Sequence, residues 1–124
     1  MNTVVWIAQA LLAVAMLGAG AMKLTKSKAE LKKSGMDWTE DFDENKIKGI
    51  GALEVLAAIG LVLPAVLDIA PVLVAVAAVG VVLLMLGAAA THARRGEQQM
   101  IVINVVLLAI AAFIAIERFG PQSF

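Results

Sequence analysis

Long apolar stretches alternate with short polar ones along the chain, and the apolar stretches have the length of membrane-spanning helices. A helix needs about 20 mostly apolar residues to cross about 30 Å of hydrocarbon. Residues 3–22 meet this requirement without a charged side chain, and residues 47–91 are long enough for two crossings. Residues 100–116 form a fourth, shorter stretch that reaches about 25 Å at 1.5 Å per residue. The pattern predicts four membrane spans.

A turn that contains two prolines divides the long apolar stretch. Pro64 and Pro71 flank Asp68, and proline lacks an N–H donor and disfavours helical geometry in the residue before it. We therefore predict spans at about 46–63 and 70–91, joined by a tight turn at Asp68. The whole chain is then a single four-span domain, an all-α integral membrane bundle of four antiparallel helices.

The composition agrees with a membrane protein and excludes several other classes. The chain is 61% hydrophobic and 16% charged, whereas soluble domains are about 45–50% apolar and about 25% charged. Disordered chains are richer in charge and poorer in apolar residues. The sequence has no cysteine and no net charge, which excludes disulfides, thiol redox chemistry and cysteine metal sites, and gives no basic face for nucleic acid. We expect the lipid bilayer to be the main partner.

Lysine and arginine are distributed asymmetrically between the two sides of these spans. The connection between the first two spans carries seven lysines, and the connection between the last two carries Arg94 and Arg95. The opposite side carries only Arg118. Because loops rich in Lys and Arg remain in the cytoplasm, we expect a multi-pass protein of the cell inner (plasma) membrane with both termini outside and both connections cytoplasmic.

The first span has an alternative interpretation as a cleaved signal peptide. Ala19-Gly20-Ala21 resembles a small-residue cleavage site. A signal peptide normally begins with a basic region, and residues 1–9 contain no Lys or Arg. The sequence therefore favours an uncleaved span.

The cytoplasmic connection between the first two spans is expected to be partly helical. Ser27 and Glu30 form a capping-box pattern, in which each side chain satisfies a free backbone N–H of the other residue. The pattern predicts a short helix over residues 28–33, which Gly35 can end.

Two aromatic residues, Trp38 and Phe42, follow within an acidic run. One interpretation is an interfacial segment that Trp38 anchors to the membrane, because tryptophan is enriched at membrane–water interfaces. The other is a lid over a cavity that faces the cytoplasm, or a surface on which a partner docks. The sequence leaves both open.

Glu54 is the most informative polar residue, because it lies about two turns inside the second span. An ionisable group at the centre of a span costs about 2.5–3.5 kcal/mol on insertion scales. Gly51, Glu54, Ala58 and Leu61 share one helix face, and its small residues allow another helix to approach the carboxyl group. We expect Glu54 to face protein or water rather than lipid.

Each span contributes one polar residue to the cytoplasmic half of the bundle, whereas Gln9 lies near the outer end of the first span. These four candidates for the lining of a pocket are Lys23, Glu54, His92 and Asn104. In one interpretation Lys23 and His92 extend toward water at the helix ends, while Asn104 and a pair of Glu54 with Lys23 hold the helices together. In the other, the four residues form a polar pocket for a small molecule or a proton. One histidine and one glutamate are too few ligands for a metal site, so we predict none, and no cofactor is evident.

The sequence resembles the DoxX-like family of small four-span membrane proteins. The resemblance is carried by Gly18-Ala-Gly20-Ala-Met-Lys23-Leu, by residues 49–64 around Glu54, and by Thr91-His92-Ala-Arg94-Arg95-Gly96-Glu97 with Asn104. It implies a compact bundle of four antiparallel helices, whose polar core the four candidate residues mark. Relatives are linked to quinones or oxidative stress, and distant eukaryotic relatives resemble chaperones for the assembly of membrane receptors.

Three functions follow from these observations. The first is a quinone- or redox-associated, or small-molecule-binding, membrane subunit that binds a quinone or other lipid-like ligand. No catalytic motif or redox centre is visible, so we expect no enzyme activity without a membrane or redox partner protein. The second is a non-enzymatic assembly protein, for which Gly- and Ala-rich faces leave room, as they do for a homodimer. The third is a small proton-coupled exporter, which the position of Glu54 in the second span disfavours.

Overall fold

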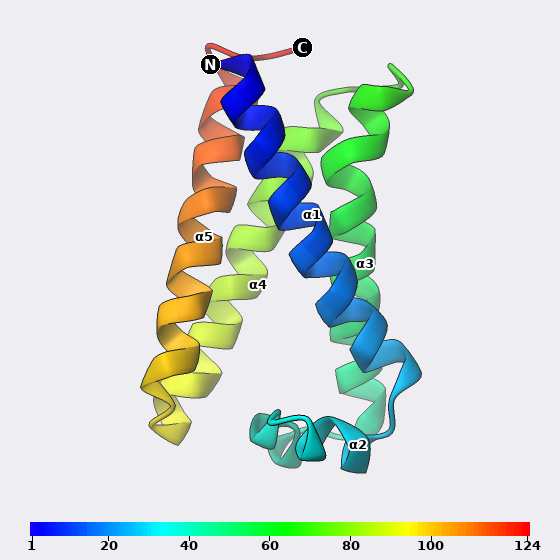
Figure 1. Ribbon diagram of the computed structural model, residues 1–124, viewed down its shortest axis with the longest axis vertical. Coiled ribbons are helices and arrows are strands. Elements are labelled where there is room, and N and C mark those ends of the chain that lie inside the picture. The colour runs from blue at the N-terminus through cyan, green and yellow to red at the C-terminus, as the bar shows by residue number, and fades with distance from the viewer.

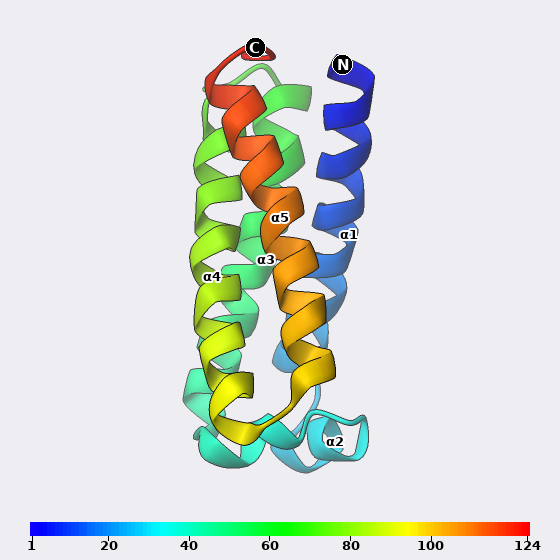
Figure 2. The same ribbon diagram turned by 90° about the vertical axis from the view of Figure 1, so that its left-hand side faces the viewer.

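Four long helices and a short helical segment make up the computed structural model, which describes residues 1–124 (Figure 1). Each long helix is long and apolar enough to cross a membrane. Consecutive long helices run in opposite directions (Figures 1 and 2), so the predicted all-α antiparallel four-helix bundle is confirmed. The elements in chain order are α1 (Asn2–Thr25), α2 (Lys28–Lys33), the 3-10 helix η1 (Asp37–Asp41), α3 (Glu44–Val66), α4 (Leu73–Arg95) and α5 (Gln98–Phe119).

The helices extend beyond the predicted spans at every end except the start of α4. Pro64 lies inside the last turn of α3, which continues to Val66. Proline supplies no N–H to the helix and crowds the carbonyl one turn before it, but the hydrogen bonds that follow it are kept, because the backbone N–H of Leu67 still donates to the carbonyl of Leu63 at 2.9 Å. Proline therefore does not end α3 at Leu63.

The turn between α3 and α4 lies three residues further along the chain than the sequence predicts. Asp68 and Ala70 have positive φ angles of 52° and 47°, a left-handed conformation that reverses the chain without extending the helix. The N–H groups of Leu73 and Val74 then donate to carbonyls three residues back. Because these turn hydrogen bonds come first, α4 begins at Leu73 rather than at residue 70.

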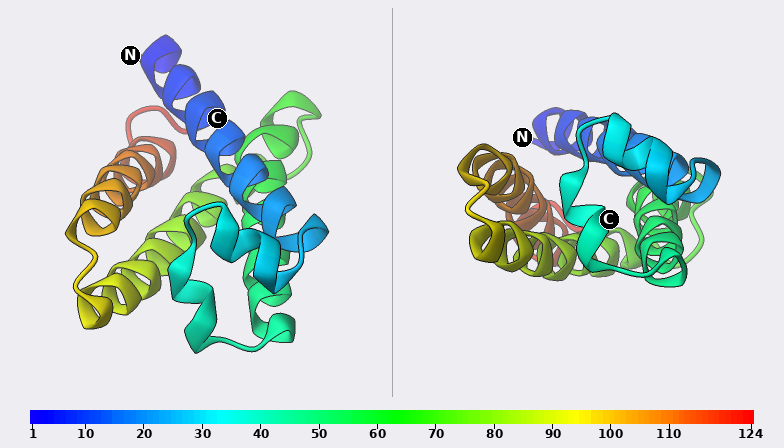
Figure 3. Two further views of the ribbon diagram at one scale, coloured as in Figure 1. Left: turned by 60° about the horizontal axis from the view of Figure 1, so that its bottom comes forward. Right: turned by 90° about the horizontal axis from the view of Figure 1, so that it is seen from below.

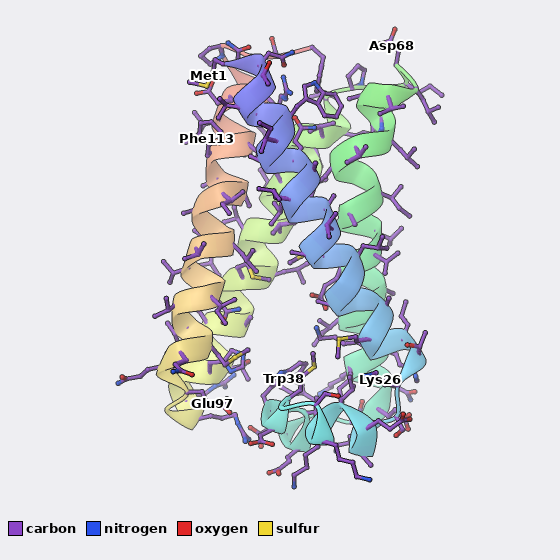
Figure 4. All side chains as sticks on the ribbon, viewed as in Figure 1. Met1, Lys26, Trp38, Asp68, Glu97 and Phe113 are labelled. Carbon is purple, nitrogen blue, oxygen red and sulfur yellow. The ribbon has the colours of Figure 1, made fainter.

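The bundle consists of two closely packed helix pairs, α1 with α3 and α4 with α5. Contacts between the pairs are fewer, and α1 contacts α5 less extensively than α3 contacts α4. Figure 1 shows α1 and α5 diverging toward the end of the bundle where α2 lies. We call this end the α2 end, and the opposite end, which holds both termini and the Asp68 turn, the terminal end (Figure 4).

The two halves of the bundle are packed differently. A continuous apolar core fills the terminal half, with contributions from all four long helices, including Leu12, Leu61, Val81 and Ile114. Only 26 of the 124 residues are buried, and large apolar side chains cover much of the outer surface of the long helices. A surface of this kind is stable in hydrocarbon rather than in water. The chain is a small integral membrane protein in contact with the lipid bilayer.

A polar cluster closes the terminal end. Arg118 at the end of α5 donates from Nε to Gln9 Oε1 at 2.6 Å and from Nη1 to Asn2 Oδ1 at 2.8 Å. Gln9 in turn donates to the carbonyl of Leu61 in α3 at 2.8 Å. One hydrogen-bonded chain therefore links α1, α3 and α5 at the terminal end.

The segment between α1 and α3, residues 26–43, folds across the α2 end and is called the cap segment below. The predicted capping box is confirmed, because Ser27 Oγ accepts from the N–H of Glu30 and Glu30 Oε1 accepts from the N–H of Ser27. An ion pair between Lys32 and Glu40 joins α2 to η1. These contacts lower the pKa of Glu30 and Glu40 below the usual value, through the Ser27 hydrogen bonds and the Lys32 ammonium respectively.

Candidate functional site

A cavity of about 840 Å³ occupies the α2 half of the bundle. It lies between the α1–α3 and α4–α5 pairs, and residues from all four long helices and from the cap segment line it. The view from below in Figure 3 shows the cap segment crossing the space between the two pairs. Small-molecule sites usually measure about 300–1,000 Å³ and have mostly apolar walls with a few polar groups. With 18 hydrophobic residues among 26, this cavity has that character.

A buried ion pair lies on the α1–α3 side of the cavity. Lys23 Nζ lies 2.7 Å from Glu54 Oε1, and both side chains are more than nine-tenths buried. The ammonium group also lies over the Trp38 ring, 5.5 Å from its centroid. Opposite charges in a medium of low dielectric attract strongly but lose their hydration. Each residue of the pair therefore depends on the other.

Two glycines bring the helices that carry this pair close together. Gly20 lies one turn before Lys23, and Gly51 lies one turn before Glu54. A Cβ atom at Gly20 would lie 2.6 Å from the carbonyl oxygen of Gly51, and one at Gly51 would lie 2.8 Å from Cβ of Lys23. No side chain fits at either position. The backbones approach here as small residues permit in membrane helices, and this approach places the two charges in contact.

One buried acceptor atom of a residue that lines the cavity has no hydrogen-bond partner in the protein. It is Oδ1 of Asn104, whose Nδ2 makes only a weak 3.7 Å contact with Met85 Sδ. Buried polar atoms are rarely left unpaired in folded proteins. This atom is therefore a candidate for contact with a bound molecule.

His92 belongs to a chain of polar contacts that ties the cap segment to the α4–α5 turn. Its Nδ1 lies 2.8 Å from Glu97 Oε1, and Arg95 Nε donates to the same oxygen at 3.2 Å. Arg95 Nη1 also donates to Asp41 Oδ2 in η1 at 2.9 Å. The chain Asp41–Arg95–Glu97–His92 therefore fixes η1 against the end of α4.

This attachment holds the aromatic residues of the cap segment over the cavity. Trp38 and Phe42 both line it, and their rings meet edge to face with centroids 5.6 Å apart. The Trp38 ring also meets the His92 ring edge to face at 6.4 Å. Trp38 lies at the α2 end of the molecule, on the side of the cap segment toward the bundle (Figure 4). Its half-buried ring contacts protein groups rather than projecting only outward.

The cavity reaches the outer surface of the bundle between α3 and α4. Leu53 and Leu56 of α3 and Leu83 of α4 line it, yet 54%, 63% and 64% of their surfaces are exposed. Nearer the terminal end the two helices close, because a Cβ at Gly60 would lie 2.9 Å from Cβ of Ala77. The opening therefore faces the surface that lipid covers.

The structure brings all four candidate residues of the sequence analysis to this one cavity. Lys23, Glu54, His92 and Asn104 are each at most 6% exposed and each line it. Lys23 and His92 were also candidates for side chains that extend toward water at helix ends, and their burial contradicts that interpretation. Gln9 lies outside the cavity, in the cluster at the terminal end.

Sequence reasoning did not identify the partners of these residues. Asp41, Arg95 and Glu97 were assigned only to charged connections, and Arg118 only to the end of a helix. Arg95 and Asp41 are 54 positions apart, and Arg118 and Gln9 are 109 apart. No local pattern links residues at such separations, although the burial of Gln9 in an apolar span was a signal that it needed a partner.

No group of three or more metal-ligating side chains is present. Comparison with known proteins gave one family. Residues 7–114 match the DoxX-like family, a stretch that covers all four long helices. No curated protein and no solved structure matches the chain. Because the family match covers most of the sequence and the helices are arranged as the resemblance implied, the chain belongs to the DoxX-like family.

Proposed function

We propose that this protein binds a lipid-like small molecule, a quinone or a related compound, in the cavity at the α2 end. The observation that carries the proposal is the combination of a mostly apolar cavity open toward the lipid-covered surface with four buried polar residues at its walls. The polar groups would contact the head of the ligand, and the apolar walls would hold its tail. If the cap segment served only as a membrane anchor, an internal cavity of about 840 Å³ would not be required.

In this proposal the protein is a binding subunit rather than a complete oxidoreductase. The sequence has no cysteine and one histidine, which excludes cysteine-ligated clusters and haem with two histidine ligands. A quinone bound here would exchange electrons with a partner protein. Lys23, His92 and Asn104 carry polar groups that would contact the head of a quinone or of its reduced form.

We also propose that the α2 end faces the cytoplasm of the cell and that the protein lies in the plasma membrane. All seven lysines and two of the three arginines belong to the α2 end, as the positive-inside rule requires. Because the chain lacks cysteine, Ser34→Cys and Ser123→Cys introduce single thiols at the two ends. In intact cells a membrane-impermeant maleimide should label only the Ser123→Cys variant. Labelling of Ser34→Cys alone would reverse the orientation.

Binding is tested with the purified protein in nanodiscs and short-chain analogues of menaquinone and ubiquinone. The Trp6→Phe variant leaves Trp38 as the only tryptophan, so quenching of its fluorescence reports on the cavity. We expect saturable quenching that weakens in Glu54→Ala and His92→Ala. Glu44→Ala, at the exposed first turn of α3, is the control and should bind normally. Absence of binding to all analogues would remove the proposal.

A non-enzymatic assembly function is the second candidate, supported by exposed glycines on the outer faces of α1 and α3. A Cβ at Gly18 or Gly49 would meet no atom within 4 Å, so another membrane helix has room to pack there. Chemical cross-linking in native membranes distinguishes this function, because it should then recover one defined partner whose yield falls in Gly18→Leu. Quinone binding would be unaffected by that substitution.

A further inference from the structure

We propose that the head group of the cavity ligand donates hydrogen bonds, and is therefore a hydroxyl group of the phenol or hydroquinone class rather than a quinone carbonyl. The inference rests on the proposed function and specifies the chemical class of the ligand's head group. It follows from identifying which polar atoms around the cavity are paired with protein groups and which are not.

One buried acceptor at the cavity has no partner in the protein. Asn104 Oδ1 on α5 receives no hydrogen bond from a protein donor, whereas Glu54 Oε1 on α3 has the Lys23 ammonium at 2.7 Å. Asn104 is only 6% exposed, so bulk water does not solvate it freely. Leaving a buried acceptor unpaired is costly, and Asn104 lines the cavity. A ligand that supplies a donor removes this cost.

Several donors at the cavity are paired with protein groups. The Lys23 ammonium faces Glu54 and the Trp38 ring, Asn104 Nδ2 points to Met85 Sδ, and His92 Nδ1 pairs with the Glu97 carboxylate. Trp38 and Arg94 also line the cavity, and their N–H groups are not part of these pairs. A quinone carbonyl, which can only accept, could contact such donors but would leave Asn104 Oδ1 unpaired.

The shape of the cavity indicates where the rest of such a molecule lies. Along α4 the cavity wall runs from Arg94 to Ala77, about 25 Å at 1.5 Å per residue. The polar side chains belong to its middle and its α2-end part, while the wall toward Ala77 is apolar and includes Gly80. A molecule with a hydroxylated ring among the polar side chains would place its alkyl tail toward the opening between α3 and α4.

A matched pair of probes tests the inference directly. In 4-nonylphenol and 4-nonylanisole the ring and tail are the same, but the methyl ether cannot donate a hydrogen bond. Binding to the Trp6→Phe protein in nanodiscs is followed by Trp38 fluorescence. We expect the phenol to bind at least about tenfold more tightly than the anisole, a difference of about 1.4 kcal/mol. A decyl hydroquinone should likewise bind more tightly than its quinone.

Variants then locate the acceptor. Asn104→Leu removes Oδ1, so we expect the phenol to lose most of its advantage while the anisole binds as before. Gln99→Leu, at an exposed position near the start of α5, is the matched control and should leave both affinities unchanged. The comparison of the phenol with the anisole uses the protein that retains Asn104. The inference can therefore be tested even if Asn104→Leu does not fold.

The outcomes separate the two proposals. Equal affinities for phenol and anisole, or tighter binding of the anisole, would overturn the donor assignment while leaving the ligand-binding function in place. That result would mean that bound water pairs Asn104 Oδ1. Binding of neither probe, together with no binding of any quinone analogue, would remove the proposed function and this inference with it.

Discussion

Lys23 and Glu54 form an ion pair of 2.7 Å between α1 and α3, with both side chains more than nine-tenths buried. Removing one partner leaves the other charge buried and uncompensated, which in folded proteins costs ~3–5 kcal/mol. We therefore expect Lys23→Met and Glu54→Leu each to lower the Tm in detergent more than the double variant does. Thermal unfolding of the three variants measures this. A double variant that loses the sum of both single effects would contradict the pairing.

The approach of Gly20 and Gly51 gives a second prediction. Alanine at Gly51 would place Cβ 2.8 Å from the side chain of Lys23, and overpacking of this kind costs about 1–3 kcal/mol. Gly49 in the same helix has open space around it, so Gly49→Ala should be neutral or stabilising, since alanine favours a helix by about 1 kcal/mol over glycine. Thermal unfolding of both variants should show opposite signs, and equal losses would refute the close approach.

The ion pair between Arg95 and Asp41 predicts how the cap segment is held. Asp41→Asn removes its charge and leaves the rest of the cap segment intact, so η1 should be held less tightly and Trp38 should become more accessible. Acrylamide quenching of Trp38 in the Trp6→Phe background should rise. The control is Arg94→Gln, because Arg94 is exposed and forms no ion pair. Unchanged quenching in Asp41→Asn would show that other contacts hold the segment.

The polar cluster at the terminal end predicts a stability effect far from the cavity. Gln9→Leu removes the acceptor of Arg118 Nε and leaves a buried donor unpaired, which costs about 1–3 kcal/mol. The Tm should fall, while the affinity for a cavity ligand should not change. Gln99→Leu, which is exposed, should change neither quantity. Loss of ligand affinity in Gln9→Leu would show that the two ends of the bundle are coupled.

Acidification should loosen the cap segment. The folded pKa values of Glu30 and Glu40 lie below the usual value, so their ionised forms stabilise the folded segment at pH values above about 4.3, the unperturbed glutamate pKa. This contribution is lost as the pH falls through their lowered pKa values. Trp38 quenching in the Trp6→Phe protein should therefore increase on acidification below about pH 4. Glu40→Gln should reduce the size of this pH-dependent change in quenching. If the quenching of Glu40→Gln followed the same pH curve as that of the protein with Glu40, the prediction would be contradicted.

The fold was predictable from the sequence because the solvent of this protein is lipid. The apolar stretches must be helical in hydrocarbon, and the rarity of polar residues in them made Glu54 and Asn104 conspicuous. Their depth along alternating helices was enough to place them near Lys23 and His92. The same argument could not predict which helices pair, because apolar faces do not distinguish one neighbour from another.

The site was less predictable because it depends on contacts between distant residues. The cap segment could be interpreted as a membrane anchor or a lid, and only the pairing of Asp41 with Arg95 shows where it folds. The ends of α3 and α4 also depended on individual turn geometry, at Pro64 and at Ala70. Neither the end of α3 nor the start of α4 can be predicted from hydropathy.

The uneven packing of the bundle has a mechanical consequence. The two helix pairs are joined by an apolar core and by the Arg118 cluster at the terminal end, and they separate around a cavity at the other. Rotation of one pair as a rigid body about the terminal end would change the width of the cavity and leave the contacts within each pair intact. A rotation of about 5° moves the far end of a 30 Å helix by about 2.6 Å. Because Asp41 in the cap segment is paired with Arg95 in α4 across that far end, their ion pair would oppose such a rotation.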